Sequence, residues 1–284
     1  MNRRNSLLRL AIVIVTIFAI ILPNGTIINA SSTNTTITYV TSEKGFIKKL
    51  YDNLLAKNKK FSIGYKGSWN DVYDQDLDGL FEQVYAIDKE DTSDDYDYMK
   101  GNIKKYSLRL SSNGKVSTFT FTVSYRETKN QTAKVNTKIA AVLESLDIAD
   151  ASDYTKVKKI HDYIVNKTTY DSGYTKYTAY QALVKRTAVC QGYALLFYKM
   201  ATEAGINCRI VTSSSHAWNI VQMGDKWYHV DTTWDDPISE KPVLRYDYFL
   251  KGTGSMTKTH TLLAEYRTKA FKKAFPISAN DYEQ

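Results

Sequence analysis

The stretch 216–236, HAWNIVQMGDKWYHVDTTWDD, limits most strongly how this chain can fold. Apolar and polar residues alternate on both sides of Gly224-Asp225. A period of two is typical of strands with one buried face, and a Gly-Asp pair suits the two-residue turn of a hairpin. We therefore expect two antiparallel strands in which Met223 faces Lys226.

The register of this hairpin decides which side chains can meet. Continued along the ladder, it places Asp231 opposite Trp218, with His216 one diagonal step away on the same face. Diagonal neighbours lie about 7–8 Å apart at Cα, within reach of a hydrogen bond between an imidazole and a carboxylate. A slip of one residue would send the two side chains to opposite faces. The pattern thus predicts a pair formed by His216 and Asp231.

A helix of about four turns is expected upstream, from near Cys190 to Gly205. Apolar residues recur along it at helical spacing: Leu196, Met200 and Ala204. Cys190 then lies at the helix N-terminus, where free N–H groups and the helix dipole favour a thiolate. A thiolate, an imidazole and a carboxylate can act as nucleophile, base and orienting group. We therefore predict that Cys190, His216 and Asp231 are the catalytic residues.

The other histidines are weaker choices for the base. His229 shares the strand face of Asp231, but it lies farther from the strand end that would meet Cys190. His161 adjoins the buried stripe of a predicted helix, where a core or capping role is expected. His260 lies in a polar tail and is expected to be exposed or structural.

These motifs resemble those of a known family. VCQGYA, HAWN and WYHVDTTWDDP, preceded by IHDYIVNKTTYD, resemble the transglutaminase-like superfamily in the chain order Cys, His, Asp, over about residues 154–237. The resemblance implies a papain-like α+β core in which the nucleophile helix packs on an antiparallel sheet. It also implies that Cys190 is the nucleophile, His216 the base and Asp231 the orienting acid. Bacterial members commonly share the upstream motif.

The resemblance leaves three functions open. The first is a thiol acyltransferase of the protein-glutamine gamma-glutamyltransferase type, which cross-links or deamidates glutamine carboxamides through a Cys thioester. The second is an extracellular cysteine peptidase or amidase with the same triad, and the third is a non-catalytic cell-surface binding module. The intact triad favours an enzyme. No cofactor is implied; the backbone N–H of Cys190 is the expected oxyanion donor, and Gln181 is a weak candidate for the second.

Residues 1–30 have the features of a secretory signal peptide. Three arginines precede an apolar run of 13 residues, 10–22, and the segment ends with small residues at Asn29-Ala30. The run is short for a spanning helix, which needs about 20 residues, although an uncleaved anchor is the alternative. We therefore expect a secreted or extracellular protein, with no stable membrane insertion after cleavage.

The remaining chain is expected to form two domains: 31–132, a small α+β domain of unknown role, and 133–284, the catalytic domain. The elements expected in them are helices at 42–58, 133–147 and 153–166, strands at 103–110 and 116–126, and an edge strand at VLRYDYFL, 243–250. The Tyr-rich stretch 168–180 is either a packed loop or the wall of a substrate groove.

Metal binding is not predicted. The acidic segment DQDLDG, 74–79, resembles the start of a calcium loop, but Tyr85 stands at position 12, where a bidentate Glu belongs. We expect a solvated turn before a helix instead. With two cysteines and no C-x-x-C motif, a zinc site is not indicated; a disulfide between Cys190 and Cys208 is the alternative to a free nucleophile.

The charge of the chain bears on its partners. The formal net charge is +8, and it falls to +5 without the three arginines of residues 1–30. This modest basic excess favours anionic surfaces such as cell-wall polymers, whereas the sequence has no Lys/Arg block of the kind that binds nucleic acid. We expect protein or peptide substrates, with cell-wall association as one option, and no nucleic acid.

Overall fold

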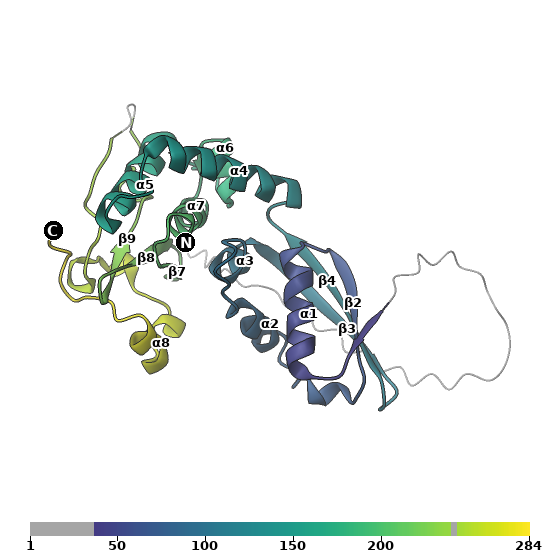
Figure 1. The fold of residues 1–284 in the computed structure, drawn as a ribbon. Helices are drawn as coiled ribbons and strands as arrows, with labels where there is room; N and C mark the ends of the chain where they lie inside the picture. Colours follow the sequence, from purple (N-terminus) through teal and green to yellow (C-terminus); the bar gives the residue numbers. More distant parts are fainter. Residues whose placement is uncertain (1–36, 240–242) are drawn as a thin grey trace, which may run out of the picture. The chain divides into compact units, whose positions relative to one another are not determined.

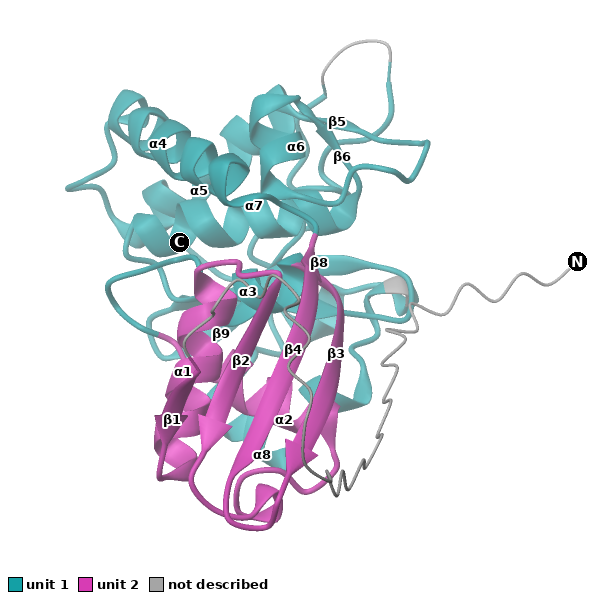
Figure 2. Ribbon diagram, turned by 90° about the vertical axis from the view of Figure 1, so that its right-hand side faces the viewer, with its two compact units in different colours: residues 1–8, 89–102, 126–284 teal, residues 9–88, 103–125 magenta. Residues whose placement is uncertain are grey.

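The computed structural model describes residues 37–239 and 243–284, so the predicted signal peptide lies outside the described residues. These residues form a mixed α+β structure with two compact units (Figure 2). Unit 1 comprises residues 89–102 and 126–284, and unit 2 comprises 37–88 and 103–125. The predicted α+β class is confirmed. In the part of the chain that is described, no helix is long and apolar enough to span a membrane.

Unit 2 contains a four-stranded sheet with two helices on one face. The sheet has the order β1-β2-β4-β3, and only β1 pairs in parallel. The same face of β4 meets both helices, since Phe119 lies 4.6 Å from the Phe46 ring of α1 and Phe121 lies 6.2 Å from the Phe81 ring of α2. The elements are β1 (Thr38–Val40), α1 (Glu43–Leu55), β2 (Lys60–Tyr65), α2 (Leu77–Tyr85), β3 (Ile103–Ser112) and β4 (Ser117–Tyr125).

Unit 1 is built around one buried helix, α7 (Cys190–Glu203). Its residues from Gly192 to Ala201 are all buried, because α5 and α6 pack on it from one side and strands β7 and β8 from the other (Figure 1). The helix is therefore enclosed apart from its two ends. The other elements of this unit are α3 (Tyr96–Asn102), α4 (Lys129–Leu146), α5 (Asp153–Lys167), β5 (Thr169–Tyr170), α6 (Ala179–Val184), β6 (Thr187–Ala188), β7 (Cys208–Thr212), β8 (Ala217–Met223), β9 (Lys226–Val230) and α8 (Lys269–Ala274).

The predicted hairpin is formed by β8 and β9 in the expected register. The pairs run from Met223–Lys226 at the turn to Asn219–Val230 at the far end, and β7 pairs with the other edge of β8. Gly224 begins the turn with φ +64°, a backbone conformation that favours glycine. The antiparallel sheet beside the nucleophile helix is thus confirmed.

Partly buried ion pairs connect residues 89–102 to the rest of unit 1. The Lys199 ammonium, fully buried on α7, pairs with Asp94, and Arg209 on β7 donates to both oxygens of Asp97 at 2.8 and 3.1 Å. Arg209 forms these two parallel bonds with its rigid guanidinium, so the contact fixes orientation as well as position. The two units therefore interleave along the chain, while the sequence boundaries at residues 30 and 132 stay predictions.

The expected edge strand at 243–250 is wrong. This segment forms no strand, because its backbone bonds to Asp231, Asp235 and Tyr282 rather than to a neighbouring strand in a regular ladder. The N–H of Arg245 donates to the Asp235 carbonyl at 3.1 Å, and the N–H of Tyr248 donates to the Asp235 carboxylate at 3.0 Å. The segment is thereby held beside the end of the hairpin.

Candidate active site

Cys190 is the first residue of α7 and is half-buried. Val189, at the N-cap position, makes no side-chain hydrogen bond to the helix. Its side chain therefore leaves the N–H groups of the first turn uncapped. Gly192 lets this helix end pack closely, because a Cβ there would lie 2.5 Å from the Ala188 Cβ and 3.0 Å from the Thr178 carbonyl oxygen. The thiol is therefore placed by a tightly packed helix start.

Asn219 connects the nucleophile helix to the hairpin. It is buried on β8, and its Nδ2 donates to the Ala194 carbonyl of α7 at 3.1 Å. The same amide lies 3.6 Å from the sulfur of Cys208 on β7. This bond holds β8 at a set position along α7, and His216 immediately precedes β8.

His216 and Asp231 lie at the same end of the hairpin. His216 Nε2 is 2.6 Å from Asp231 Oδ2, and the two side chains are 9% and 1% exposed. Since Nε2 is used in this bond, Nδ1 is the ring nitrogen left for Cys190, whose side chain lies near enough to raise the pKa of His216. The structure therefore brings together the three side chains that the sequence pattern selected.

His216 and Asp231 each shift the pKa of the other so that its charged form is favoured. Burial alone would lower the pKa of His216, but the Asp231 carboxylate and then the Cys190 side chain outweigh burial and raise it to about 10. Burial alone would raise the pKa of Asp231, but His216 and His260 outweigh it and hold that pKa well below its usual range. At neutral pH the site thus contains an imidazolium and a carboxylate.

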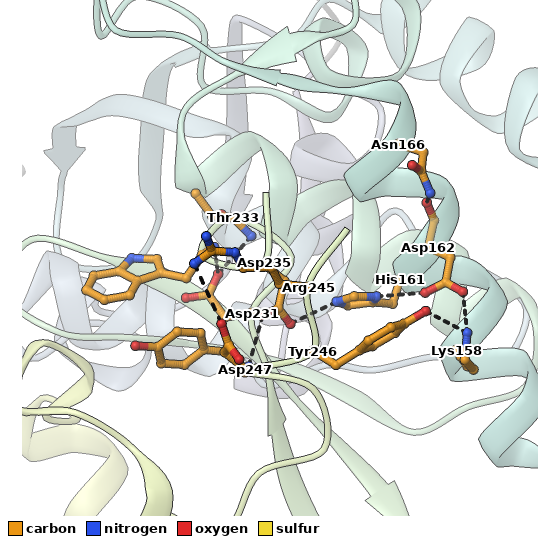
Figure 3. Close-up of polar contacts among 12 residues, drawn as sticks. Lys158, His161, Asp162, Asn166, Asp231, Thr233, Asp235, Arg245, Tyr246 and Asp247 are labelled. Atoms are coloured by element: carbon orange, nitrogen blue, oxygen red, sulfur yellow. Dashed lines mark hydrogen bonds and ion pairs between the residues drawn. The ribbon is translucent and has the colours of Figure 1, made fainter. Parts of the chain in front are cut away.

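Asp231 has hydrogen-bond donors on both of its oxygens. Oδ1 accepts from the backbone N–H groups of Thr233 and Trp234 at 2.9 and 3.2 Å (Figure 3). Oδ2 accepts from His216 and, at 2.8 Å, from Nε2 of His260. Four N–H groups therefore compensate for the burial of this carboxylate.

His260 is the residue that sequence reasoning missed. It was expected to be exposed or structural in a polar tail, yet its side chain is fully buried against Asp231. Residues 257–263 show neither helical nor strand periodicity, and the contact spans 29 residues of chain. No local signal in the sequence could have indicated it.

The other two histidines are not bases for Cys190. His229 is buried, and its Nδ1 accepts a hydrogen bond from the Trp218 indole at 2.9 Å. Burial, followed by the proximity of His260, lowers the pKa of His229 to about 4. His161 is also buried, with Nε2 2.9 Å from Asp235 and Nδ1 3.1 Å from Asp162 (Figure 3). The structural role expected for His161 is consistent with these contacts.

The remaining sequence candidates have local partners. The alternative disulfide is absent, since Cys190 and Cys208 are both free thiols. Burial, followed by the nearby Asp97, raises the pKa of Cys208 well above its usual value. Gln181, the weak candidate for an oxyanion donor, uses its Oε1 to accept the Thr178 N–H in a capping box on α6.

The Tyr-rich stretch is a closed loop beside Cys190. Asp171 accepts hydrogen bonds from the backbone N–H groups of Thr175 and Lys176 at 2.7 and 2.9 Å, which closes it. Burial, followed by the nearby Cys190 side chain, raises the pKa of Tyr170 to about 12. Tyr174 is 64% exposed. The loop therefore combines a packed part with an exposed ring, and its role as the wall of a substrate groove stays a prediction.

One group of metal-ligating side chains occurs within the described residues. Ligand atoms of His216, Asp231 and His260 lie within 4.8 Å of one another. Two imidazoles and a carboxylate are a donor set that zinc accepts. In this structure the same atoms form the two N–H···O bonds to Asp231, so they have partners within the chain.

Comparison with known proteins bears on this site. Residues 140–232 match the family model of the Transglutaminase-like superfamily. The kyphoscoliosis peptidases of Homo sapiens and Mus musculus are similar, with 29% identity over 137 residues and 28% over 119 residues. These matches cover 38% and 34% of this chain but only 21% and 18% of the relatives, so the chain spans about a fifth of their length. A solved structure described as a TGase aligns with 80% of this chain and 65% of its own, at 15% identity and a TM-score of 0.35.

Proposed function

Because residues 140–232 belong to the transglutaminase-like superfamily, we propose that this protein is a thiol acyltransferase acting on amide groups of proteins. The observation that carries the proposal is the hydrogen-bonded pair of His216 and Asp231 beside Cys190, at the start of a buried helix. In this arrangement the thiol, the proton donor and the orienting carboxylate belong to one packed unit. Their catalytic roles are part of the proposal.

The first step forms a thioester. The Cys190 thiolate attacks a glutamine carboxamide carbon, and the imidazolium of His216 gives its proton to the leaving ammonia. Asp231 stabilises the imidazolium and fixes the ring orientation. The backbone N–H of Cys190 is the proposed oxyanion donor, and loss of such a donor typically costs about 10²–10³ in rate.

The second step releases the acyl group. A primary amine or water attacks the thioester carbon, His216 takes up the proton of the attacking group, and the C–S bond breaks to regenerate the thiolate. An amine gives a cross-link and water gives deamidation. No cofactor is needed in either case.

A second candidate is a cysteine peptidase with the same three residues. The observation that favours it is that the human and mouse relatives are named peptidases. In that reaction the carbonyl attacked belongs to a backbone peptide bond, and the leaving group is an amino terminus. Water then resolves the acyl-enzyme.

One experiment separates these reactions. The protein is incubated with a glutamine-rich protein and a labelled primary amine, and mass spectrometry identifies the products. We expect amine adducts or a mass gain from deamidation at glutamine, both lost in Cys190→Ala. Backbone cleavage that depends on Cys190 would support the peptidase instead. No modification of any kind would favour the binding module.

We also propose that the protein acts outside the cell on protein or peptide substrates. Its positive net charge favours action at anionic surfaces such as cell-wall polymers. The proposal rests on the features of residues 1–30 and on the net charge. N-terminal sequencing of protein recovered from culture medium tests it. A mature chain that begins near residue 31 is the expected result, and retention of residues 1–30 in the cell fraction would contradict it.

A further inference from the structure

His260 is fully enclosed beside the candidate active site. Its Nε2 lies 2.8 Å from Asp231 Oδ2, and its Nδ1 lies 2.9 Å from the hydroxyl of Thr257. A carboxylate oxygen only accepts, so His260 is the donor in the first bond. Both ring nitrogens therefore have partners, and the bonds continue from Thr257 through His260 and Asp231 to His216.

Aromatic side chains hold the His260 ring in place. It stacks on Tyr248 with centroids 4.9 Å apart and planes 24° apart. The rings of Trp218 and Trp234 each lie 4.9 Å away, at 79° and 68° to it. These contacts leave the imidazole one orientation, in which Nε2 points at Asp231.

The bond to His260 gives Asp231 a constraint that its other partners do not supply. Thr233 and Trp234 hold Oδ1 through backbone N–H groups, whereas among the described residues only His216 and His260 donate to Oδ2. In the proposed reaction His216 also transfers protons beside Cys190. His260 is then the donor on Oδ2 that has no second role in the reaction. Hydrogen bonds to a charged acceptor are about twice as strong as neutral ones and fix its direction.

We propose that His260 is a positioning residue for the acyl-transfer reaction: it holds Asp231 Oδ2 where His216 Nε2 meets it, and thereby keeps His216 Nδ1 aimed at Cys190. The inference deepens the proposed function and rests on it. His260 itself touches neither the nucleophile nor the substrate. Its loss should therefore lower kcat and leave KM unchanged.

Two matched variants test the role of the Nε2 donor. In His260→Gln the amide nitrogen reaches about as far as Nε2, whereas in His260→Asn it reaches only as far as Nδ1. Both variants replace the ring by a neutral amide, so they disturb the contacts with Tyr248, Trp218 and Trp234 similarly. We expect His260→Asn to lower turnover about 10-fold or more, the loss typical of a charged hydrogen bond, and His260→Gln to recover most of it. His161→Gln, a change at a buried histidine that bonds to Asp235 and not to Asp231, should stay within about two-fold of the wild type per active thiol.

Turnover is expressed per active thiol, counted by stoichiometric iodoacetamide alkylation of Cys190 and located by mass spectrometry. A purely structural role would reduce the number of active thiols and leave kcat per thiol unchanged in all three variants. Equal kcat per thiol in His260→Gln and His260→Asn would overturn the proposal. If neither variant folds, Thr257→Val, which removes the partner of Nδ1, is compared with wild type; unchanged kcat per thiol would then overturn it.

The alkylation rate of Cys190 separates this inference from the proposed function, because it needs no substrate. His216→Ala should change that rate several-fold at pH 7. If it does not, the proposed triad itself fails. If His216→Ala changes the rate while both His260 variants match the wild type in rate and in turnover, only the role of His260 is refuted.

Discussion

In unit 1, His216 pairs with Asp231 and His161 pairs with Asp235, two acids that are four positions apart in the chain, and these two pairs differ in the features that the proposed chemistry needs. His216 meets Asp231 at 2.6 Å, and His161 meets Asp235 at 2.9 Å. In the first pair the imidazole has the Cys190 side chain as a further neighbour, whereas in the second pair the other ring nitrogen faces the carboxylate of Asp162. His161 and Asp235 are both fully buried, and His216 keeps a partly exposed edge.

The two acids also respond differently to burial. Burial alone would raise the pKa of Asp231, but two imidazoles outweigh it and that pKa lies far below its usual range. Asp235 has one imidazole and a backbone N–H, and burial raises its pKa despite them. A buried His–Asp contact therefore does not by itself indicate a catalytic role: the two pairs differ in the number of donors on the acid and in the second neighbour of the imidazole.

Replacement of the histidine in each pair should give the largest difference in acyl-transfer activity between the two pairs. His216→Ala removes the proton donor, so acyl transfer should fall by at least about 10³-fold, because members of such a unit act together. His161→Leu should leave turnover per alkylatable Cys190 within a few-fold of the wild type. Labelled-amine incorporation measures both. Comparable losses in the two variants would mean that His161 takes part in the chemistry.

The same two variants should rank in the opposite order for stability: His161→Leu should destabilise the fold more than His216→Ala. His161→Leu leaves the fully buried Asp235 without its imidazole, and removal of one partner of a buried ion pair costs about 3–5 kcal/mol. His216→Ala leaves Asp231 with three donors and should cost less than half as much. Urea unfolding at pH 7 measures the free energies. An equal loss in both would show that the two pairs contribute alike to the fold.

The pH dependence of activity should follow the first pair alone. The pKa of His216 is raised to about 10, so the imidazolium that donates the proton persists through neutral pH and is lost as the pH rises through about 10. We expect kcat/KM to fall on this alkaline limb. Asp231→Asn removes the anion that raises the pKa, so the limb should move to lower pH, whereas Asp235→Asn should not move it. An alkaline limb near pH 7 in the wild type would contradict the assignment.

Linkage predicts a related effect on stability. Because the pKa of His216 is higher in the folded protein than its usual value of 6.5, this group stabilises the fold fully below about pH 6.5. That contribution is lost as the pH rises through about 10. Asp231 has the opposite sign, since its lowered pKa stabilises the fold above about pH 4 and is lost on further acidification.

The sequence allowed the first pair to be predicted because its geometry is local. The alternation around Gly224 set the hairpin register, and the register placed His216 and Asp231 on one face. The contact of His260 and the conformation of 243–250 could not be predicted, because both depend on hydrogen bonds with the acidic residues at the end of the hairpin, Asp231 and Asp235. The attachment of residues 89–102 to unit 1 likewise depends on distant partners such as Lys199 and Arg209. Periodic patterns report on neighbouring strands and helix faces, but they contain no information about such isolated contacts.

The smallest expected effect is that of calcium. Its candidate ligands are the acids of the segment 74–79 in unit 2, away from both His–Asp pairs in the sequence. Their carboxylates already have partners: Asp74 accepts the Asp76 N–H at 3.1 Å, Asp76 caps α2 by accepting the Gly79 N–H at 2.9 Å, and Asp78 bonds to the Tyr106 hydroxyl. Tyr85 occupies the place of the bidentate Glu, and it is buried at the end of α2. A cation that prefers 6–8 oxygen ligands therefore finds too few free ones here.

Activity should accordingly change by less than about two-fold between excess chelator and millimolar calcium, since an incomplete ligand set binds weakly. Labelled-amine incorporation is measured in both conditions, with Asp74→Asn as the variant because Asp74 does not cap the helix. The reaction proposed at His216 and Asp231 proceeds through the thiol and proton transfers, so chelation should remove nothing from it. A strong rise with calcium that Asp74→Asn abolishes would show that the acidic segment regulates the site, and the two His–Asp pairs would then have to be compared again with the ion bound.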